Sequence, residues 1–237
     1  MPDYLWHALP YLLLGAFPDG PLGGAALTLL LAVCSALGSA LIGFVAGVAL
    51  AMSRGLVHVT ILAVIGFFRA IPVLLLIFWT FFVLPLLLHV DLPSQPTVVV
   101  ALSFVGGAYL AHAVHAGIVA VSAGQWQAAL SLGLTRRQAL RFIIMPQALR
   151  IMIPSFVNQW VALIKDTSLA YIVGVPELSF LANQVNSRLM VHPVEIFLFV
   201  ALLYFALCTG LGWGAARLLE RAAGDGSRSA SRGVTGS

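Results

Sequence analysis

Charged residues are scarce in this chain, and their scarcity excludes a water-soluble globule. Aspartate, glutamate, lysine and arginine make up 8% of its 237 residues, whereas 61% are hydrophobic. The mean hydropathy is +1.03. Because soluble domains carry about 25% charged residues, the composition predicts an integral membrane protein.

Cysteine and catalytic motifs are also scarce. Cys34 and Cys208 lie far apart in apolar runs without metal-ligand spacing, which favours ordinary helix packing. HExxH, GxSxG and the phosphate-cradling GxxxxGK[ST] are missing. The arginines cluster beside apolar runs, which is typical of membrane orientation and not of a nucleic-acid-binding face. We therefore expect no enzymatic activity, no bound metal or cofactor, and no nucleic-acid partner.

Long apolar runs are abundant. A bilayer core takes roughly 20 apolar residues per helix. The predicted fold is all-α with five transmembrane helices, at about 24–52, 60–88, 97–121, 150–175 and 195–218. The run Leu5–Phe17 contains Pro10 and is too short to cross, so we expect an interfacial helix there.

Basic and acidic residues fall on opposite sides of the predicted spans. The basic side holds Arg54, Arg136, Arg137, Arg141, Arg150, Arg217, Arg221, Arg228 and Arg232. The other side holds Asp3, Asp19, Asp91, Glu177 and Glu195. Because lysine and arginine favour cytoplasmic loops, we expect the N-terminus outside and the C-terminus in the cytosol. The Gly/Ser/Arg-rich tail from Gly224 is predicted to be disordered.

Small residues recur at every fourth position in two of the spans. The first span carries Ser35, Ser39, Gly43, Gly47 and Ala51, and the fifth carries Ala206, Gly210 and Gly214. Such stripes let helix backbones approach closely in lipid. We expect packing within the chain or between subunits, in preference to a flexible hinge.

A polar segment between the third and fourth spans, which we call the 123–146 loop, carries helix-boundary signals. Ser122-x-x-Gln125 and Thr135-x-x-Gln138 both fit a capping box, and Gly133 fits a left-handed C-cap. These signals predict a helix over 123–132, a turn, and a second helix from 136, with Pro146 marking re-entry into the membrane. The segment is either an amphipathic loop on the membrane surface or a plug for a cleft in a partner.

Several ordered blocks carry a family resemblance. They include Gln127-Ala128-Ala129 with Gly133 and Ile143-x-Met145-Pro146, and FFRAIP at 67–72, GAYLAHAVHAGI at 107–118, LIKDTSL at 163–169 and GVPEL at 174–178. The first block looks like the EAA loop of ABC importer permeases. Together the blocks resemble the polar amino-acid (histidine/glutamate/glutamine/arginine/opine) permease family over about 23–221.

The resemblance implies a MetI-like permease fold in a bacterial inner membrane. A transmembrane permease domain at 23–221 would lie between an N-terminal segment at 1–22 and the tail at 222–237. The implied partners are a cytoplasmic ABC ATPase dimer that uses ATP and Mg²⁺, a second identical or homologous permease chain, and a periplasmic or surface-bound binding protein. The residues expected to couple to the ATPase are Gln127, Ala128, Ala129, Gly133, Leu134, Arg137 and Pro146.

The chain departs from the family pattern at three positions. Gln127 replaces the first EAA glutamate, which keeps the shape but loses a charge. His112 and His115 replace an acidic residue and an arginine. No third metal ligand is evident beside the two histidines, so we favour interhelical hydrogen bonding near the cytoplasmic face over a metal site.

Polar residues at membrane depth are the candidates for a substrate pathway. Lys165 and Asp166 would each cost roughly 2.5–3.5 kcal/mol at mid-bilayer, so each must face protein, water or substrate. They form a buried network between helices or line the pathway. Arg69 is either a bidentate clamp for a carboxylate or a topology anchor. The candidate pathway residues are Arg69, Asn158, Lys165, Asp166, Thr167 and Ser168.

These observations favour the transmembrane permease subunit of an ATP-driven importer for polar amino acids. We expect glutamate/aspartate, because RAIPVLLLIFWTFFVLP at 69–85 resembles the acidic amino-acid members. The alternative is a self-sufficient secondary transporter that is driven by protons through Asp166 or His112.

Overall fold

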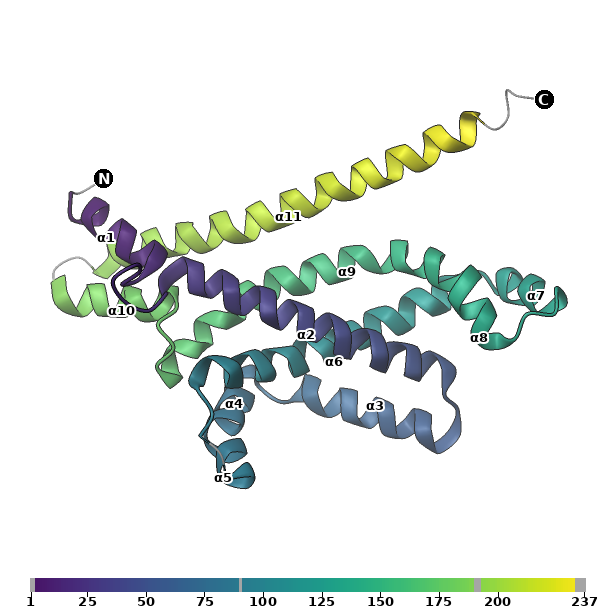
Figure 1. Ribbon diagram of the computed structural model, residues 1–237, viewed down its shortest axis with the longest axis horizontal. Helices are drawn as coiled ribbons and strands as arrows, with labels where there is room; N and C mark the ends of the chain where they lie inside the picture. Colours follow the sequence, from purple (N-terminus) through teal and green to yellow (C-terminus); the bar gives the residue numbers. More distant parts are fainter. Residues whose placement is uncertain (1–2, 90, 190–192, 233–237) are drawn as a thin grey trace.

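The computed structural model describes residues 3–89, 91–189 and 193–232, and within these ranges the chain is helical with no β-strand beyond isolated bridges. Four helices have the length and composition to cross a membrane. A bent helix pair makes a fifth if it is counted as one span, which agrees with the five predicted. Four helices run roughly along the long axis of the molecule: α2 (Gly24–Met52), α3 (Gly55–Ala70), α6 (Ser94–Ala120) and α9 (Met145–Asp166) (Figure 1).

Helices α2, α6 and α9 form the centre of the bundle. The small-residue stripe of α2 lies against α6. A Cβ atom added at Gly47 would lie 2.5 Å from the Cβ atom of Val114. The predicted close approach of backbones is therefore confirmed for the first span.

The second span is bent, in contrast to the single helix expected over 60–88. Helix α3 ends before Pro72, and α4 (Val73–Phe78) leaves at 98° to it. The π-helical η1 (Trp79–Val83) and α5 (Leu84–Leu88) follow. Proline disfavours the helical conformation of the residue before it, and Ile71 accordingly has an extended ψ of 132°.

The fourth span begins earlier than the expected residue 150. Helix α8 (Arg136–Ala139), the π-helical η2 (Leu140–Ile144) and α9 join end to end, and η3 (Thr167–Val173) completes a 38-residue stretch. Pro146 lies inside this continuous stretch, directly after the π-helical η2, and lacks the N–H that another residue would donate there, yet the helix does not end at it. Its role as the point of re-entry into the membrane stays a prediction.

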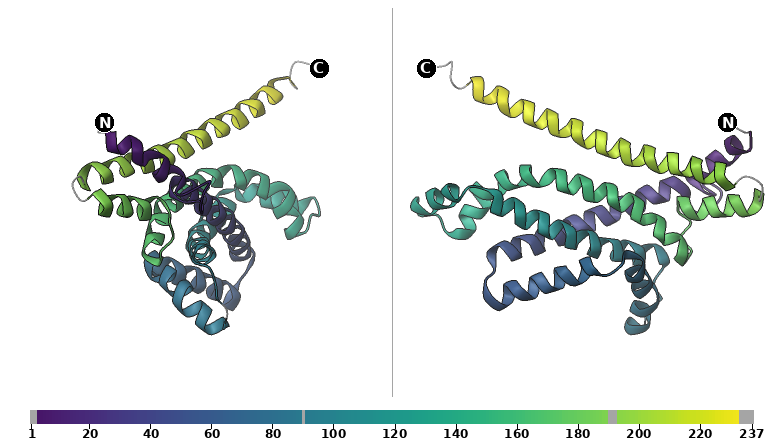
Figure 2. Two further views of the ribbon diagram at one scale, coloured as in Figure 1. Left: turned by 60° about the vertical axis from the view of Figure 1, so that its left-hand side comes forward. Right: turned by 180° about the vertical axis from the view of Figure 1, so that it is seen from behind.

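The two ends of the bundle differ. Helix α7 (Ala123–Ser131) lies with α8 at one end, whereas α1 (Asp3–Leu14) and α10 (Leu178–Leu189) lie at the other (Figure 1). Helix α11 (Pro193–Arg232) starts at the α10 end and diverges from α9 along its length (Figure 2). It continues as a helix through most of the segment 222–237, and residues 233–237 lie outside the described residues.

Candidate functional site

A polar face on α9 stands out within the membrane part of the bundle. Lys165, the sole lysine of the chain, is exposed, and so is Asn158. Seven residues make about two helical turns, so the two side chains share one face. An exposed lysine at this depth is unfavourable against lipid, so this face must meet water, substrate or another chain.

The face of α9 that carries Lys165 and Asn158, which we call the lysine face, borders a pocket of about 470 Å³ between α9 and α11. We call this pocket the lysine pocket. Its polar groups are an ammonium, two hydroxyls and a thiol. It is lined by Lys165, Ser168, Ala201, Tyr204, Phe205 and Cys208. The Lys165 ammonium and the Ser168 hydroxyl provide hydrogen-bond donors for a carboxylate ligand, whereas the Tyr204 hydroxyl already donates to Glu177.

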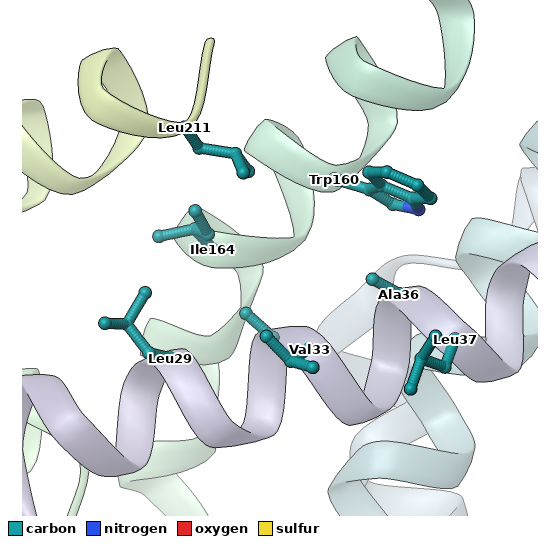
Figure 3. A pocket seen from close by; sticks show the side chains of 8 residues that line it. Leu29, Val33, Ala36, Leu37, Trp160, Ile164 and Leu211 are labelled. Atoms are coloured by element: carbon teal, nitrogen blue, oxygen red, sulfur yellow. The ribbon is translucent and has the colours of Figure 1, made fainter. Parts of the chain in front are cut away.

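A second cavity, of about 270 Å³, lies between α2, α9 and α11 (Figure 3). Aliphatic side chains such as Leu29, Ile164 and Leu211 line it, with Trp160 at one side (Figure 3). The indole N–H of Trp160 is buried and has no hydrogen-bond partner. No group in this lining can hold a charged end of a solute, so the lysine pocket is the chemically relevant one.

The predicted pathway residues that follow Lys165 in sequence differ in whether they reach the lysine pocket. Ser168 lines the lysine pocket, and Asp166 is half-buried beside Lys165. Thr167 is fully buried and its hydroxyl donates to the carbonyl oxygen of Ile164 at 2.7 Å. The Thr167 hydroxyl is thus already used within its own helix.

Arg69 does not join the lysine pocket. It lies at the end of α3, and its guanidinium carbon is 5.0 Å from the ring centroid of Tyr109 on α6. Because Arg69 is exposed and not among the residues lining the lysine pocket, the structure does not bring it together with Lys165.

His112 and His115, the two histidines that depart from the family pattern, lie on α6. His115 is near His58 of α3. The rings of His115 and His58 are edge to face with centroids 6.4 Å apart, and Nδ1 of His58 is 3.1 Å from the carbonyl oxygen of Leu50. Within the described part of the chain, no group of three potential ligands is placed to hold a metal ion.

The 123–146 loop folds largely as its boundary signals predict. Gly133 has φ +82°, and the Leu134 N–H donates to the carbonyl oxygen of Ala129 at 3.2 Å, which closes the turn. The capping box of Thr135 and Gln138 is present. The box predicted at Ser122 is wrong, because the Ser122 side chain makes no cap hydrogen bond.

Two leucines are exposed on this loop among polar residues. Leu132 is 82% exposed, and Leu130 near it is 48% exposed. Of the predicted coupling residues, Ala129 is buried and Leu134 is half-buried. The exposed ones are Gln127, Ala128, Gly133, Arg137 and Pro146. The described part of the chain thus leaves these two leucines open to the surroundings.

A buried carboxylate organises the α10 end. Glu177 is fully buried, and its carboxylate accepts hydrogen bonds from the Ser179 N–H at 2.9 Å, the Phe180 N–H at 2.8 Å and the Tyr204 hydroxyl at 2.8 Å. Burial raises the pKa of Glu177 to about 7, although these hydrogen bonds oppose the rise. We call these four residues the Glu177 cluster.

Sequence reasoning used Glu177 only as an acidic topology marker and missed this cluster. A signal was present: Glu177 follows Pro176 and directly precedes an apolar-periodic segment, which is the position of a helix cap. The contact to Tyr204, 27 residues further on, has no such local signal. Leu132 was also missed, because an exposed leucine in a loop looks ordinary in sequence.

The fold is that of a membrane protein with a polar face among its apolar helices. Residues 39–223 match the family model of the binding-protein-dependent transport system inner membrane component, and the chain belongs to this family. It is the permease subunit of an ABC amino-acid importer.

Curated relatives resemble the chain over most of its length. It is 36% identical over 200 residues to a probable glutamine ABC transporter permease of Bacillus subtilis, covering 84% of this chain and 91% of that one. It is 32% identical over 219 residues to the glutamine transport system permease of Escherichia coli, covering 92% and 95%. A glutamate/aspartate import permease of Escherichia coli is 34% identical over 152 residues, covering 61% and 67%.

Solved structures show the same architecture. A crystal structure of an amino acid ABC transporter with histidines matches with a TM-score of 0.75 and 25% identity, covering 84% of this chain and 92% of that one. An inward-facing methionine ABC transporter matches with a TM-score of 0.76 at 18% identity, covering 93% and 99%. The second match shows the fold alone, and it confirms the expected MetI-like permease fold.

Proposed function

We propose that this chain forms one half of an amino-acid pathway through the cytoplasmic membrane and is driven by a separate ATPase docked on the 123–146 loop. The α7 end then faces the cytosol, and the N-terminus and α10 face outward. The arginines of the loop support this orientation, because lysine and arginine favour the cytoplasmic side.

One observation carries the proposal: the second half of the loop and the lysine face belong to one continuous helical stretch. The stretch Arg136–Val173 begins in the loop and continues to Lys165 and Ser168 at the lysine pocket. A displacement of the loop is therefore transmitted along the backbone to the polar face. This is the mechanical link that ATP-driven transport requires, since the sequence contains no phosphate-binding loop of its own.

The ATPase partner fits the exposed leucines of the loop. Leu130 and Leu132 are apolar and open to the surroundings, and grouped exposed apolar side chains with a polar rim mark protein-interaction sites. Gly133 and the Thr135 cap fix the turn that presents them. Arg137 is exposed on the following helix and adds positive charge at its edge.

A second permease chain fits the open lysine face. Lys165 and Asn158 are exposed on a membrane-spanning helix, and the α11 stripe at Gly210 and Gly214 has open space around it within this chain. Polar groups at membrane depth face a bundle interior or a water-filled cavity. A second permease copy placed against this side would enclose such a cavity.

The substrate class we propose is a polar amino acid whose carboxylate meets Lys165. The sequence favours glutamate/aspartate, whereas the relatives with the highest coverage are named for glutamine. Glutamine and glutamate share the α-carboxylate and side-chain length and differ by an amide. We therefore rank glutamine first and glutamate second for testing.

Co-purification from native membranes tests the proposal. We expect an ATPase and a second five-span chain to elute with this one, and we expect ATP hydrolysis to rise with glutamine-loaded binding protein. The rival is a proton-coupled carrier acting through Asp166 or His112. Isolation of the chain without any ATPase, together with uptake driven by a pH gradient, would support that rival.

A further inference from the structure

We propose that Glu177 is a positioning residue that fixes the Tyr204 wall of the lysine pocket to the first turn of α10. This inference rests on the proposed function, because it treats the lysine pocket as part of the pathway. It makes α10 the element through which events at the outward end of the permease reach the pocket.

The geometry joins two helices, α10 and α11, at one carboxylate. Oε2 of Glu177 accepts from both the Ser179 N–H and the Tyr204 hydroxyl, and Oε1 accepts from the Phe180 N–H. The Ser179 hydroxyl lies 3.1 Å from the Tyr204 hydroxyl. Tyr204 is therefore held on its polar end by α10, while its side chain lines the pocket that contains Lys165.

A simple helix cap does not explain a glutamate at this position. Serine, threonine, aspartate and asparagine are the side chains that usually bond the free amides of a helix N-terminus. A fully buried carboxylate without a cationic partner in its cluster is unfavourable, and its third hydrogen bond reaches out of α10 to α11. The longer side chain thus links the cap to Tyr204.

Within the described part of the chain, Tyr204 is the only ionisable side chain near α10 that bonds the Glu177 carboxylate. The elements that pack against α10 are α1, α2, α11 and η3. The ionisable side chains that these elements, α10 itself and the lysine pocket carry at the α10 end of the bundle are Tyr11, Tyr171, Arg188, Glu195, Tyr204, Lys165 and Cys208.

Helix α10 also borders a surface pocket that an approaching molecule can enter. Asn183 and Arg188 line this pocket of about 500 Å³ with Tyr171 of η3. Phe180, whose N–H bonds the Glu177 carboxylate, lines it as well, so the surface pocket and the Glu177 cluster share a residue. A molecule that shifts α10 acts on Tyr204 through Glu177.

The chain carries its own reporter for this link. Cys208 lines the lysine pocket, and Cys34 is the only other cysteine of the chain. In a Cys34→Ser background, the labelling rate of Cys208 by a water-soluble maleimide in native membranes reports the shape of the pocket. The test compares Tyr204→Phe, Glu177→Gln and the double variant.

We expect each single variant to change the Cys208 labelling rate by about threefold or more, because each removes a hydrogen bond that holds the wall. The double variant should match the single variants, since both act on one contact. Tyr11→Phe is the matched control: it removes a tyrosine hydroxyl bonded to Gln184 on α10, away from the lysine pocket, and should leave the rate unchanged.

Two results would overturn the inference. The first is an unchanged labelling rate in Tyr204→Phe, and the second is a changed rate in Tyr204→Phe with an unchanged rate in Glu177→Gln, which would reduce Glu177 to a helix cap. If Glu177→Gln fails to accumulate, Tyr204→Phe alone still decides. Because the labelling needs neither ATP nor a partner, it remains readable even if ATP-driven uptake is never observed.

Discussion

The two ends of the bundle use their side chains in opposite ways. At the α10 end, polar groups distant in sequence bond one another: Glu177 reaches Tyr204, and the Leu178 N–H donates to the hydroxyl of Thr28. At the α7 end, hydrogen bonds within the 123–146 loop are mostly local, and Leu132 is left 82% exposed. The polar groups of one end bond one another, and the other end exposes leucines where we propose that a partner docks.

This difference separates what stabilises the permease from what drives it. Buried polar groups that satisfy one another fix a unique arrangement, as at α10. An exposed apolar side chain such as Leu132 contributes little to the fold, and we propose that it contributes to an interface. Substitutions at the α10 end should therefore change stability and pocket shape, whereas substitutions at the α7 end should change coupling alone.

The largest effect is expected from Leu132→Asp. The side chain is exposed, so the fold should be unaffected, but a buried aspartate in the partner's pocket should lower ATP-driven uptake by about 100-fold. Leu56→Asp is the matched control, because Leu56 in α3 is also 82% exposed and lies outside the loop. Equal uptake in both variants would remove the docking surface from the account.

A smaller effect is expected where the pathway meets the substrate. Lys165→Met removes the ammonium from the lysine pocket and should lower uptake by about tenfold, the value of one charged hydrogen bond. Lys165→Arg keeps the charge and should retain more activity than Lys165→Met. Identical substrate-dependent uptake rates in wild type and Lys165→Met would show that this lysine only braces helices.

The two small-residue stripes give a stability prediction. An added Cβ at Gly47 would lie 2.6 Å from the Ala111 carbonyl oxygen, so Gly47→Ala should cost about 1–3 kcal/mol and lower the melting temperature. Gly210→Ala meets nothing within 4 Å and should leave the melting temperature unchanged. The measurement is thermal unfolding of the detergent-solubilised chain, and equal melting of both variants would contradict the packing of α2 on α6.

The smallest effect is a pH dependence of stability. Burial raises the pKa of Glu177 from 4.5 to about 7, so the folded chain binds this proton more tightly than the unfolded chain. The associated stability is present below about pH 4.5 and is lost as the pH rises through 7, by about 1–3 kcal/mol. Glu177→Gln should flatten this part of the pH profile of thermal unfolding; a profile that is unchanged would assign the titration to another group.

Local signals in the sequence predicted local structure well. Gly133 and Thr135 specify the loop turn because each acts on backbone groups within a few residues. The capping box predicted at Ser122 does not form, because the backbone N–H of Gln125 donates to the carbonyl oxygen of Ser122 and not to its side chain. Pro72 signals a possible bend in the sequence, but the 98° angle between Gly55–Ala70 and Val73–Leu87 depends on how α4 packs.

Contacts between distant segments were beyond sequence reasoning. Lys165 and Ser168 were placed in the pathway on polarity alone, and the structure puts both in one pocket. Arg69 had the same polarity but lies against Tyr109, because α3 ends on another side of α6. The Glu177 cluster depends on how α10 meets α11, which no short-range pattern encodes.

The most direct test is solute accumulation in proteoliposomes. The account predicts that this chain alone accumulates no glutamine or glutamate under a pH gradient, and that ATP-dependent accumulation appears when its ATPase, second permease chain and loaded binding protein are added. Accumulation by the chain alone, without ATP hydrolysis, would contradict the claim that work enters through the 123–146 loop.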